Sequence, residues 1–292
     1  MSNPRSTRLA ADTAQIRRLG IEDLPACLHL AADREWPPEI NNWRLLFDVG
    51  VVYGIDDPDG GLAGAVVSTP YGRELSAIGM MLVAKKHERR GLGARLMRHA
   101  LEHGETASTW LSATDYGRPL YEKLGFRTIG RITTYVGPFR PPEAASGGSH
   151  VPVSRPSTLA DLPAILALDA AVFGAPRAAL MTRFQSSAHA LRVVDSAAGI
   201  AGFGGAWRND DSTSLGPVSA DDTDLALALL ADLASVTDGP VRVDVDHRHP
   251  RLSAWAEAHG LRPTSTADVM VHGAPLPGDR ARVFTPVKMA LG

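Results

Sequence analysis

Cysteine is almost absent from this chain of 292 residues: Cys27 is the only one, so an intramolecular disulfide is excluded. Cys27 falls on the apolar side of an expected helix, and we interpret it as a small core residue instead of a catalytic thiol. The sequence also lacks an apolar run long enough to cross a membrane, and its start has no signal-peptide pattern. From these absences we expect a cytoplasmic protein that makes no contact with a membrane.

An excess of charge of one sign is missing as well. The 30 Lys and Arg residues stand against 32 Asp and Glu residues, which leaves a formal net charge of −2 and no general attraction to nucleic acid. Nucleic acid is therefore not an expected partner. A hydrophobic content of 44% over this length is enough for two domains of ordinary size, each with its own core.

The most informative stretch combines a strand, a basic loop and a helix. The apolar run from Ile78 to Ala84 predicts a buried strand. Apolar residues then recur at helical spacing from Leu92 to Leu101, and Gly104 marks the expected end of that helix. The loop between them contains Gly91 and Gly93, so the first N–H groups of the helix are left without side chains around them. Such a helix start is a binding site for an anion.

The spacing of these glycines narrows down the anion. The loop matches neither a nucleotide P-loop nor the dinucleotide-binding fingerprint. Arg-Arg-Gly-Leu-Gly-Ala at 89–94 instead resembles the pyrophosphate-binding motif of the GNAT superfamily of acyl-CoA-dependent N-acyltransferases, Gln/Arg-x-x-Gly-x-Gly/Ala. Glu88 stands where that motif has Gln or Arg. The backbone cradle does not depend on this side chain, and Arg89 and Arg90 still supply positive charge.

A second motif lies downstream, where a short helix is closed by Gly125 and leads into a strand from Phe126 to Val136. The segment 120–126, Leu-Tyr-Glu-Lys-Leu-Gly-Phe, resembles the GNAT signature Leu-Tyr-x-Lys-x-Gly-Phe. The resemblance implies that Tyr121 lies beside the sulfur of CoA and serves as the general acid. The alternative is an ordinary half-buried aromatic residue that stabilises the helix.

The resemblance implies acetyl-CoA as acyl donor, with its pantetheine arm between the central strand and a strand at 108–113. The side chains and amides expected to contact the donor are Met81, Leu82, Val83, Glu88, Arg89, Arg90, Gly91, Leu92, Gly93, Ala94 and Tyr116. A basic cluster that also includes Lys85 and Lys86 suits the phosphates of CoA.

The acceptor side is expected in the region between the first two helices, which shapes the acceptor pocket in GNAT proteins. Trp36, Trp43 and Tyr71 are the candidate substrate-binding residues, although aromatic residues at a helix joint are more often packing residues. Glu39 is the candidate general base, with a solvated loop carboxylate as the alternative reading. The other candidates for the base are Glu74 and Asp115, and Tyr71 or Tyr116 is the candidate group for positioning a water molecule.

The chain repeats itself after a linker rich in Pro, Gly and Ser at 139–150. Asp-Leu-Pro-Ala occurs at both 23–26 and 161–164, and a shift of 135 residues aligns much of the second half with the first. The same shift places alanines on the two loop glycines, aspartates on Lys86 and Arg89, and Ala256 on Tyr121. The predicted domains are therefore 1–138, a GNAT domain that binds acyl-CoA, and 151–292, a degenerate GNAT-like domain.

The predicted fold class is α/β (α+β), with two tandem GNAT-like domains, each a mixed and mostly antiparallel sheet flanked by helices. The predicted activity is transfer of an acetyl group to the amine of a small metabolite or amino-acid-like acceptor. Two alternatives stay open: a donor on acyl-carrier protein or aminoacyl-tRNA, and a non-catalytic acyl-CoA sensor. No metal is expected, because Asp246, His247 and His249 lack a ligand spacing. A homodimer and the placement of 282–291 stay open as well.

Overall fold

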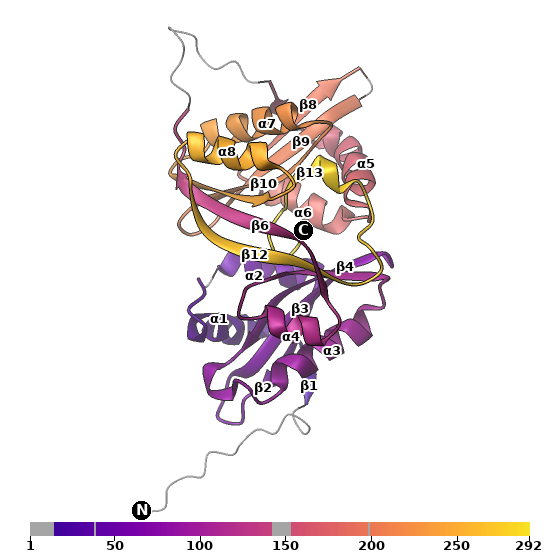
Figure 1. Cartoon of the computed structure of the whole chain (residues 1–292), viewed down its shortest axis with the longest axis vertical. Coiled ribbons are helices and arrows are strands. Elements are labelled where there is room, and N and C mark those ends of the chain that lie inside the picture. The colour runs from indigo at the N-terminus through magenta and orange to yellow at the C-terminus, as the bar shows by residue number, and fades with distance from the viewer. Residues whose placement is uncertain (1–14, 38, 142–152, 198) are drawn as a thin grey trace, which may run out of the picture.

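A single continuous sheet organises the whole molecule. The computed structural model describes residues 15–37, 39–141, 153–197 and 199–292 (Figure 1). The sheet has 13 strands in the order β1-β2-β3-β4-β5-β12-β6-β11-β10-β9-β8-β7, with β13 paired to β10 off this path. Most neighbouring strands are antiparallel, whereas β4 with β5 and β10 with β11 are parallel. The observed architecture is the predicted mixed, mostly antiparallel α/β arrangement.

The first half follows the expected order of elements. Strand β4 begins at Leu75, three residues before the predicted apolar run, and the helix expected from Leu92 begins there and ends at Gly104. The elements of this half are β1 (Ile16–Leu19), η1 (Ile21–Asp23), α1 (Leu24–Asp33), α2 (Ile40–Val49), β2 (Val51–Asp56), β3 (Leu62–Tyr71), β4 (Leu75–Val83), η2 (Lys85–His87), α3 (Leu92–Gly104), β5 (Ser108–Ala113), α4 (Arg118–Lys123) and β6 (Arg127–Pro138).

The second half repeats this order. Its elements are β7 (Arg155–Pro156), η3 (Leu159–Asp161), α5 (Leu162–Phe173), α6 (Ala178–Ser187), β8 (Ala190–Ser196), β9 (Gly199–Arg208), β10 (Thr213–Ala220), α7 (Thr223–Ser235), β11 (Pro240–Asp246), α8 (Pro250–Ala258) and β12 (Arg262–Gly273), followed by η4 (Arg280–Arg282) and β13 (Val283–Thr285). The repeat extends to side chains. Arg17 bridges Asp23 and Asp56 at 2.8 and 2.9 Å, and Arg155 makes the same two ion pairs at 2.8 and 2.7 Å with Asp161 and Asp195.

The two halves exchange their last strands, and this exchange joins them into one sheet. Strand β12 of the second half pairs with β5, and strand β6 of the first half pairs with β11. The two exchanged strands pair with each other along the middle of the molecule, where Figure 1 shows them crossing between the halves. The sheet therefore runs across the sequence positions at which we expected one domain to end. Of the expected linker, residues 142–150 lie outside the described residues, and Phe139 stacks on His259.

Helices cover both faces of the sheet. Trp110 and Leu111 are neighbours on β5 and point to opposite faces, and they belong to two different cores. The core around Trp110 is shared by α1, α2, α5 and α6, so it holds the two halves together. On the other face, α3 and α4 form a core in the first half, and α7 and α8 form one in the second half. At the surface, Arg183 of α6 pairs with Asp48 of α2 at 2.8 Å.

The C-terminal segment contacts both halves. Strand β13 adds to β10 in the second half, and the residues after it cross to the first half. The Tyr71 hydroxyl donates a hydrogen bond to the carbonyl oxygen of Leu291 at 2.6 Å, and Ala290 packs directly on the backbone of Gly79. The placement of residues 282–291 stayed open in the sequence. In the structure this segment adds a strand to the second half of the sheet and also reaches the first half.

Candidate active site

The parallel strands β4 and β5 separate at a bulge in β4. Their pairing runs from Leu75 opposite Ser108 to Ile78 opposite Leu111, and neither the rest of β4 nor the rest of β5 continues it in the described structure. A bulge of this kind bends its strand away from one neighbour. Beyond Ile78, the edge of β4 that faced β5 therefore borders the gap, while its other edge stays paired with β3.

The bulge consists of two residues of β4 that face one residue of β3. Gly79 pairs with Val67 and Leu82 pairs with Ala65, which leaves Met80 and Met81 opposite Val66 alone. Met80 has a φ of 49°, which is a strained conformation for a residue with a side chain and costs of order 1–3 kcal/mol. Strain of this size persists only where the surroundings enforce it. Here the tight packing of Ala290 on Gly79 lies directly beside it.

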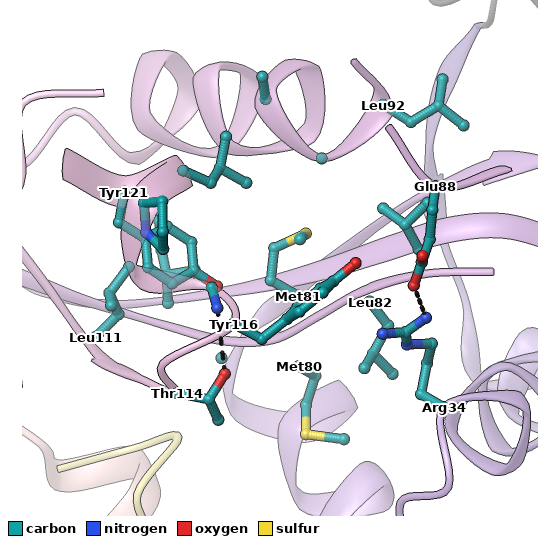
Figure 2. A pocket seen from close by; sticks show the side chains of 18 of the residues that line it. Arg34, Met80, Met81, Leu82, Glu88, Leu92, Leu111, Thr114, Tyr116 and Tyr121 are labelled. Carbon is teal, nitrogen blue, oxygen red and sulfur yellow. Dashed lines mark hydrogen bonds and ion pairs between the residues drawn. The ribbon is translucent and has the colours of Figure 1, made fainter. Parts of the chain in front are cut away.

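A cleft of about 740 Å³ opens where the two strands separate (Figure 2). It runs between the bulge of β4, the start of α3 and the first turn of α4, so it brings both sequence motifs together. Its lining consists of Arg34, Trp36, Ile78, Gly79, Met80, Met81, Leu82, Val83, His87, Glu88, Arg89, Gly91, Leu92, Gly93, Ala94, Leu111, Ser112, Thr114, Tyr116, Gly117, Pro119, Leu120, Tyr121 and Lys123.

The start of α3 faces this cleft without a side-chain cap. Gly91 holds the N-cap position with a φ of 82°, a left-handed conformation that glycine adopts without strain. The N–H groups of the first turn have no partner within the helix, and the helix dipole adds partial positive charge to them. A Cβ added at Gly93 would lie 3.2 Å from Cε of Met81 and 3.3 Å from Cδ2 of Leu120. Gly93 therefore faces the cleft, and its lack of a side chain leaves the amides accessible to an anion.

The basic residues of the loop have different tasks. Lys85 is paired with Glu35, and Lys86 lies 2.7 Å from the buried carboxylate of Asp57, which also contacts His87 at 2.9 Å. Burial alone would raise the pKa of Asp57, but hydrogen bonds from Lys86, from the backbone amide of Asp59 and from His87 together outweigh it and lower the pKa. These lysines therefore hold the loop in place, whereas we expected them to meet phosphates. Arg89 forms no ion pair within contact distance among the described residues, although its charge helps to lower the pKa of the neighbouring Glu88.

Tyr121 belongs to α4 and lines the cleft on the side opposite the start of α3. The side chain is only 8% exposed, and burial raises the pKa of its phenol to about 12, so it is protonated at neutral pH. A Cβ at Gly117 would come within 2.9 Å of the Tyr121 ring, so this glycine gives the ring its place. Figure 2 shows Tyr121 beside Leu111, across the cleft from Leu92. A protonated phenol at this position is able to donate a proton to a group bound in the cleft.

Arg34 is a cleft residue that the sequence did not reveal. It follows α1 and forms an ion pair with Glu88, which is drawn in Figure 2. Its guanidinium carbon also lies 5.5 Å from the centre of the Tyr116 ring. The only signal in the sequence was indirect: a carboxylate at a position that usually carries Gln or Arg needs a cationic partner.

Four expected site residues do not line the cleft. Trp43 is fully buried in the shared core, and Tyr71 is 3% exposed and packs edge-on against Phe173. Trp43 and Tyr71 are therefore packing residues, which was the alternative interpretation of these aromatic side chains. Glu39 faces Lys288 at 4.0 Å, at the contact between the halves. Arg90 contacts His87 at the foot of the loop, whereas Trp36 does line the cleft and is 41% exposed.

The corresponding helix start in the second half, unlike that of α3, has a side-chain cap. The side chain of Asp222 caps α7 by accepting a hydrogen bond from the amide of Leu225 at 2.9 Å. Asp224 adds a second carboxylate in the first turn of that helix, where it pairs with Arg251 at 2.5 Å. A helix start that is already capped by a carboxylate, with another close by, repels further negative charge.

In the second half, strand β13 occupies the gap between β10 and β11. Strand β10 has the same bulge, since Leu215 pairs with Ala206 and Val218 pairs with Gly204. Strand β13 pairs with β10 at this bulge and also contacts β11, so the chain itself fills the space that is open in the first half. A Cβ at Gly216 would lie 2.1 Å from the carbonyl oxygen of Pro286, which shows how closely this segment approaches.

Among the described residues, no three His, Cys, Asp or Glu side chains converge as metal ligands, and no helix is long and apolar enough to span a membrane. His247 hydrogen-bonds the hydroxyl of Thr133 at 2.8 Å, and His249 hydrogen-bonds the carbonyl oxygen of Val283 at 2.9 Å. Both histidines of this sequence cluster therefore have partners inside the protein.

Comparison with known proteins identifies the family. Residues 56–137 and residues 165–285 each match an acetyltransferase (GNAT) domain family. YitH of Bacillus subtilis (strain 168), described as an uncharacterized N-acetyltransferase, is 25% identical over 281 residues, which cover 95% of this chain and 98% of that protein. The chain belongs to the GNAT acetyltransferases and is an enzyme of this family with two GNAT domains in tandem.

Solved structures share the fold over nearly the whole length. A putative acetyltransferase from Pyrococcus horikoshii has a TM-score of 0.81 at 18% identity, and the match covers 98% of each chain. A tandem GNAT protein from the clavulanic acid biosynthesis pathway has a TM-score of 0.62 at 16% identity, covering 89% of this chain and 99% of that chain. These likenesses concern the fold, and the tandem arrangement is part of it.

Proposed function

We propose that the first half of the chain transfers an acetyl group from acetyl-CoA to the amine of a small-molecule acceptor, and that the second half binds no acyl donor. One observation carries this proposal: the uncapped start of α3, the bulge of β4 and the phenol of Tyr121 open onto the same cleft. Anion binding, a site for a carbonyl group and a proton donor are the three functions that thioester aminolysis needs in one place.

The residues of the cleft divide these tasks among them. The amides at Leu92, Gly93 and Ala94, together with Arg89, hold the diphosphate of the donor. Acetyl-CoA supplies the acetyl group as a thioester when it is bound. Backbone amides near Leu82, in the part of β4 that no longer pairs with β5, are available to the carbonyl oxygen of the thioester. These groups are fixed before the donor arrives, so little reorganisation is required.

Tyr121 is the proposed general acid. Its pKa of about 12 keeps the phenol protonated over the physiological range, so it is ready to return a proton to a departing thiolate. The acceptor amine must first lose its own proton, which costs roughly 4 kcal/mol at neutral pH for an amine with a pKa near 10. Among the described residues, Glu88 is the sole carboxylate lining the cleft, and Arg34 holds it. This favours proton loss to water over direct transfer to Glu39, which stays a prediction.

The size of the acceptor follows from what closes the cleft. Ala290 covers Gly79 and the carbonyl group of Leu291 is held by Tyr71, so the second half blocks one side of the bulge. This enclosure favours a small amine over a protein chain. A homodimer and a cytoplasmic location stay predictions.

Calorimetric titration of acetyl-CoA into the purified chain tests the proposal, since it reports stoichiometry as well as affinity. We expect one site per chain with micromolar affinity, followed by release of free thiol when small amines are added. Two sites would contradict the closed second half. Absence of binding would overturn acetyl-CoA as the donor and favour an acyl group on a carrier protein or on tRNA. Binding without thiol release from any amine would favour the sensor.

A further inference from the structure

Glu88 poses an electrostatic problem for the proposed donor site. It lines the cleft three positions before Gly91, where the GNAT motif has Gln or Arg, so a carboxylate stands next to a diphosphate site. The carboxylate of Glu88 and the diphosphate of the donor are both negative, so they repel each other unless a cation compensates the carboxylate. The protein therefore either binds an anion poorly at this loop or compensates Glu88 from elsewhere.

The compensating cation comes from a distant part of the chain. Arg34, which is 54 residues away in sequence, forms an ion pair with Glu88. Its side chain is 18% exposed and that of Glu88 is 31% exposed, so the pair lies at the edge of the cleft and not in open solvent. Burial opposes the charge on Arg34, but the hydrogen bonds and the electrostatic attraction to Glu88 and Tyr116 together outweigh it, so the pKa of Arg34 is raised. The hydrogen bond from Arg34 likewise lowers the pKa of Glu88, so both groups are ionised at neutral pH.

Tyr116 joins this pair from the other wall of the cleft. It lies in the turn between β5 and α4, its side chain is 67% exposed, and its ring is 5.5 Å from the guanidinium carbon of Arg34. Figure 2 shows its hydroxyl directed towards Glu88 and Arg34, in front of the bulge residue Met81. Three segments that are far apart in the sequence therefore meet across the cleft: the end of α1, the phosphate loop and the β5–α4 turn.

We propose that Arg34 is a donor-positioning residue: it neutralises Glu88 at the diphosphate loop and, with Tyr116, forms a bridge across the cleft that retains the pantetheine arm of the donor. The inference rests on the proposed function and extends it to residues outside the two motifs. The bridge explains why this chain accommodates a glutamate at the motif position. It also makes the contribution of Arg34 conditional on Glu88.

A double-mutant cycle tests this conditional role, with acetyl-CoA as the probe and calorimetry as the readout. We expect Arg34→Ala to weaken acetyl-CoA binding at least tenfold, because Glu88 loses its ion-pair partner. Glu88→Gln alone is expected to change the dissociation constant by less than about threefold. The double variant, Arg34→Ala with Glu88→Gln, is expected to recover to within about threefold of Glu88→Gln, since no charge is then left to compensate and only the contact of Arg34 with Tyr116 is lost.

The controls separate charge from folding. Arg34→Lys is expected to keep most of the affinity of the unaltered chain, because it keeps the charge. Arg251→Ala removes the cation from an ion pair with Asp224 at the matching helix of the second half, and it is expected to leave acetyl-CoA binding unchanged. Thermal unfolding of each variant shows whether the fold is retained.

Each outcome decides the inference. A double variant that binds as weakly as Arg34→Ala would overturn charge compensation, because Arg34 would then act independently of Glu88. Unchanged binding by Arg34→Ala would overturn any role of Arg34 in holding the donor. Both results presuppose that the unaltered chain binds acetyl-CoA. If it does not, the proposed function fails, and this inference fails with it.

Discussion

Replacing Gly93 by aspartate introduces a carboxylate at the start of α3 and tests the anion site directly. Gly93 lies in the first turn of the helix, where its backbone conformation is open to any residue. The added Cβ would point between Met81 and Leu120, both of which line the cleft. The new carboxylate would therefore stand beside the amides that we assign to the diphosphate of the donor.

The size of the effect follows from Coulomb's law. A single negative charge at about 5 Å from another, with an effective dielectric constant of about 20, is repelled by about 3 kcal/mol. This corresponds to about a hundredfold weaker binding of acetyl-CoA. The effect is expected to shrink at high salt, because the cleft is open to solvent at its mouth. Calorimetric titration at low and at high ionic strength measures both quantities.

Two matched variants complete this experiment. Gly93→Asn has nearly the same shape without the charge, so it isolates the crowding against Met81 and Leu120. Ala228→Asp places the same carboxylate at the position of the second half that the repeat aligns with Gly93, and it is expected to have no effect on binding. Equal weakening by Gly93→Asn and Gly93→Asp would refute the electrostatic reasoning. Weakening by Ala228→Asp would refute the claim that the second half binds no donor.

Three further predictions concern catalysis and stability. Tyr121→Phe is expected to lower turnover at least tenfold with an unchanged dissociation constant for acetyl-CoA, and unchanged turnover would remove Tyr121 as the acid. Because the pKa of Tyr121 is about 12, the pH–rate profile of the unaltered chain should show no loss from phenol ionisation below about pH 11. Asp57 has a lowered pKa, so its contribution to stability is present above its ordinary value of 3.8 and is lost as the pH falls below it. The difference in Tm between Asp57→Asn and the unaltered chain should therefore shrink in acid, and a pH-independent difference would contradict this. Gly79→Val is expected to destabilise the fold by about 1–3 kcal/mol, because the new Cβ would lie 2.6 Å from Cβ of Ala290, and thermal unfolding measures it; an unchanged Tm would show that the C-terminal segment packs loosely there.

The features that the sequence predicted correctly are those that depend on neighbouring residues. The helix from Leu92 to Gly104 follows from apolar residues at helical spacing, and Gly91 and Gly125 take up left-handed conformations where the motifs required turns. The tandem repeat was visible for the same reason, because each copy uses the same local signals, such as Arg17 and Arg155 with their aspartates. The proposal that the second half binds no donor rests on a change of residue type at matching positions, and it stays a prediction.

The exchange of β6 and β12 was not predictable from these signals. Each strand begins with mostly exposed residues and continues into a run of buried ones, so the two patterns are alike and do not show which half each strand pairs with. Which pairing forms depends on the connection between the halves and on the packing of both at once. The insertion of β13 beside β10 has the same origin: a strand of three residues carries little local information, and its position follows from a gap that exists only after the sheet has formed.

Some residues of the cleft were predictable from the sequence, and others were not. The sequence alone defined the glycines of the loop and the position of Tyr121, because these are motifs with a fixed spacing along the chain. Only the tertiary structure decided that Arg34 compensates Glu88, that Trp43 and Tyr71 are buried in the shared core, and that the C-terminal segment covers Gly79. The physical reason is the range of the interactions: backbone conformation is set by a few adjacent residues, whereas charge pairing and burial are set by whatever the fold brings alongside.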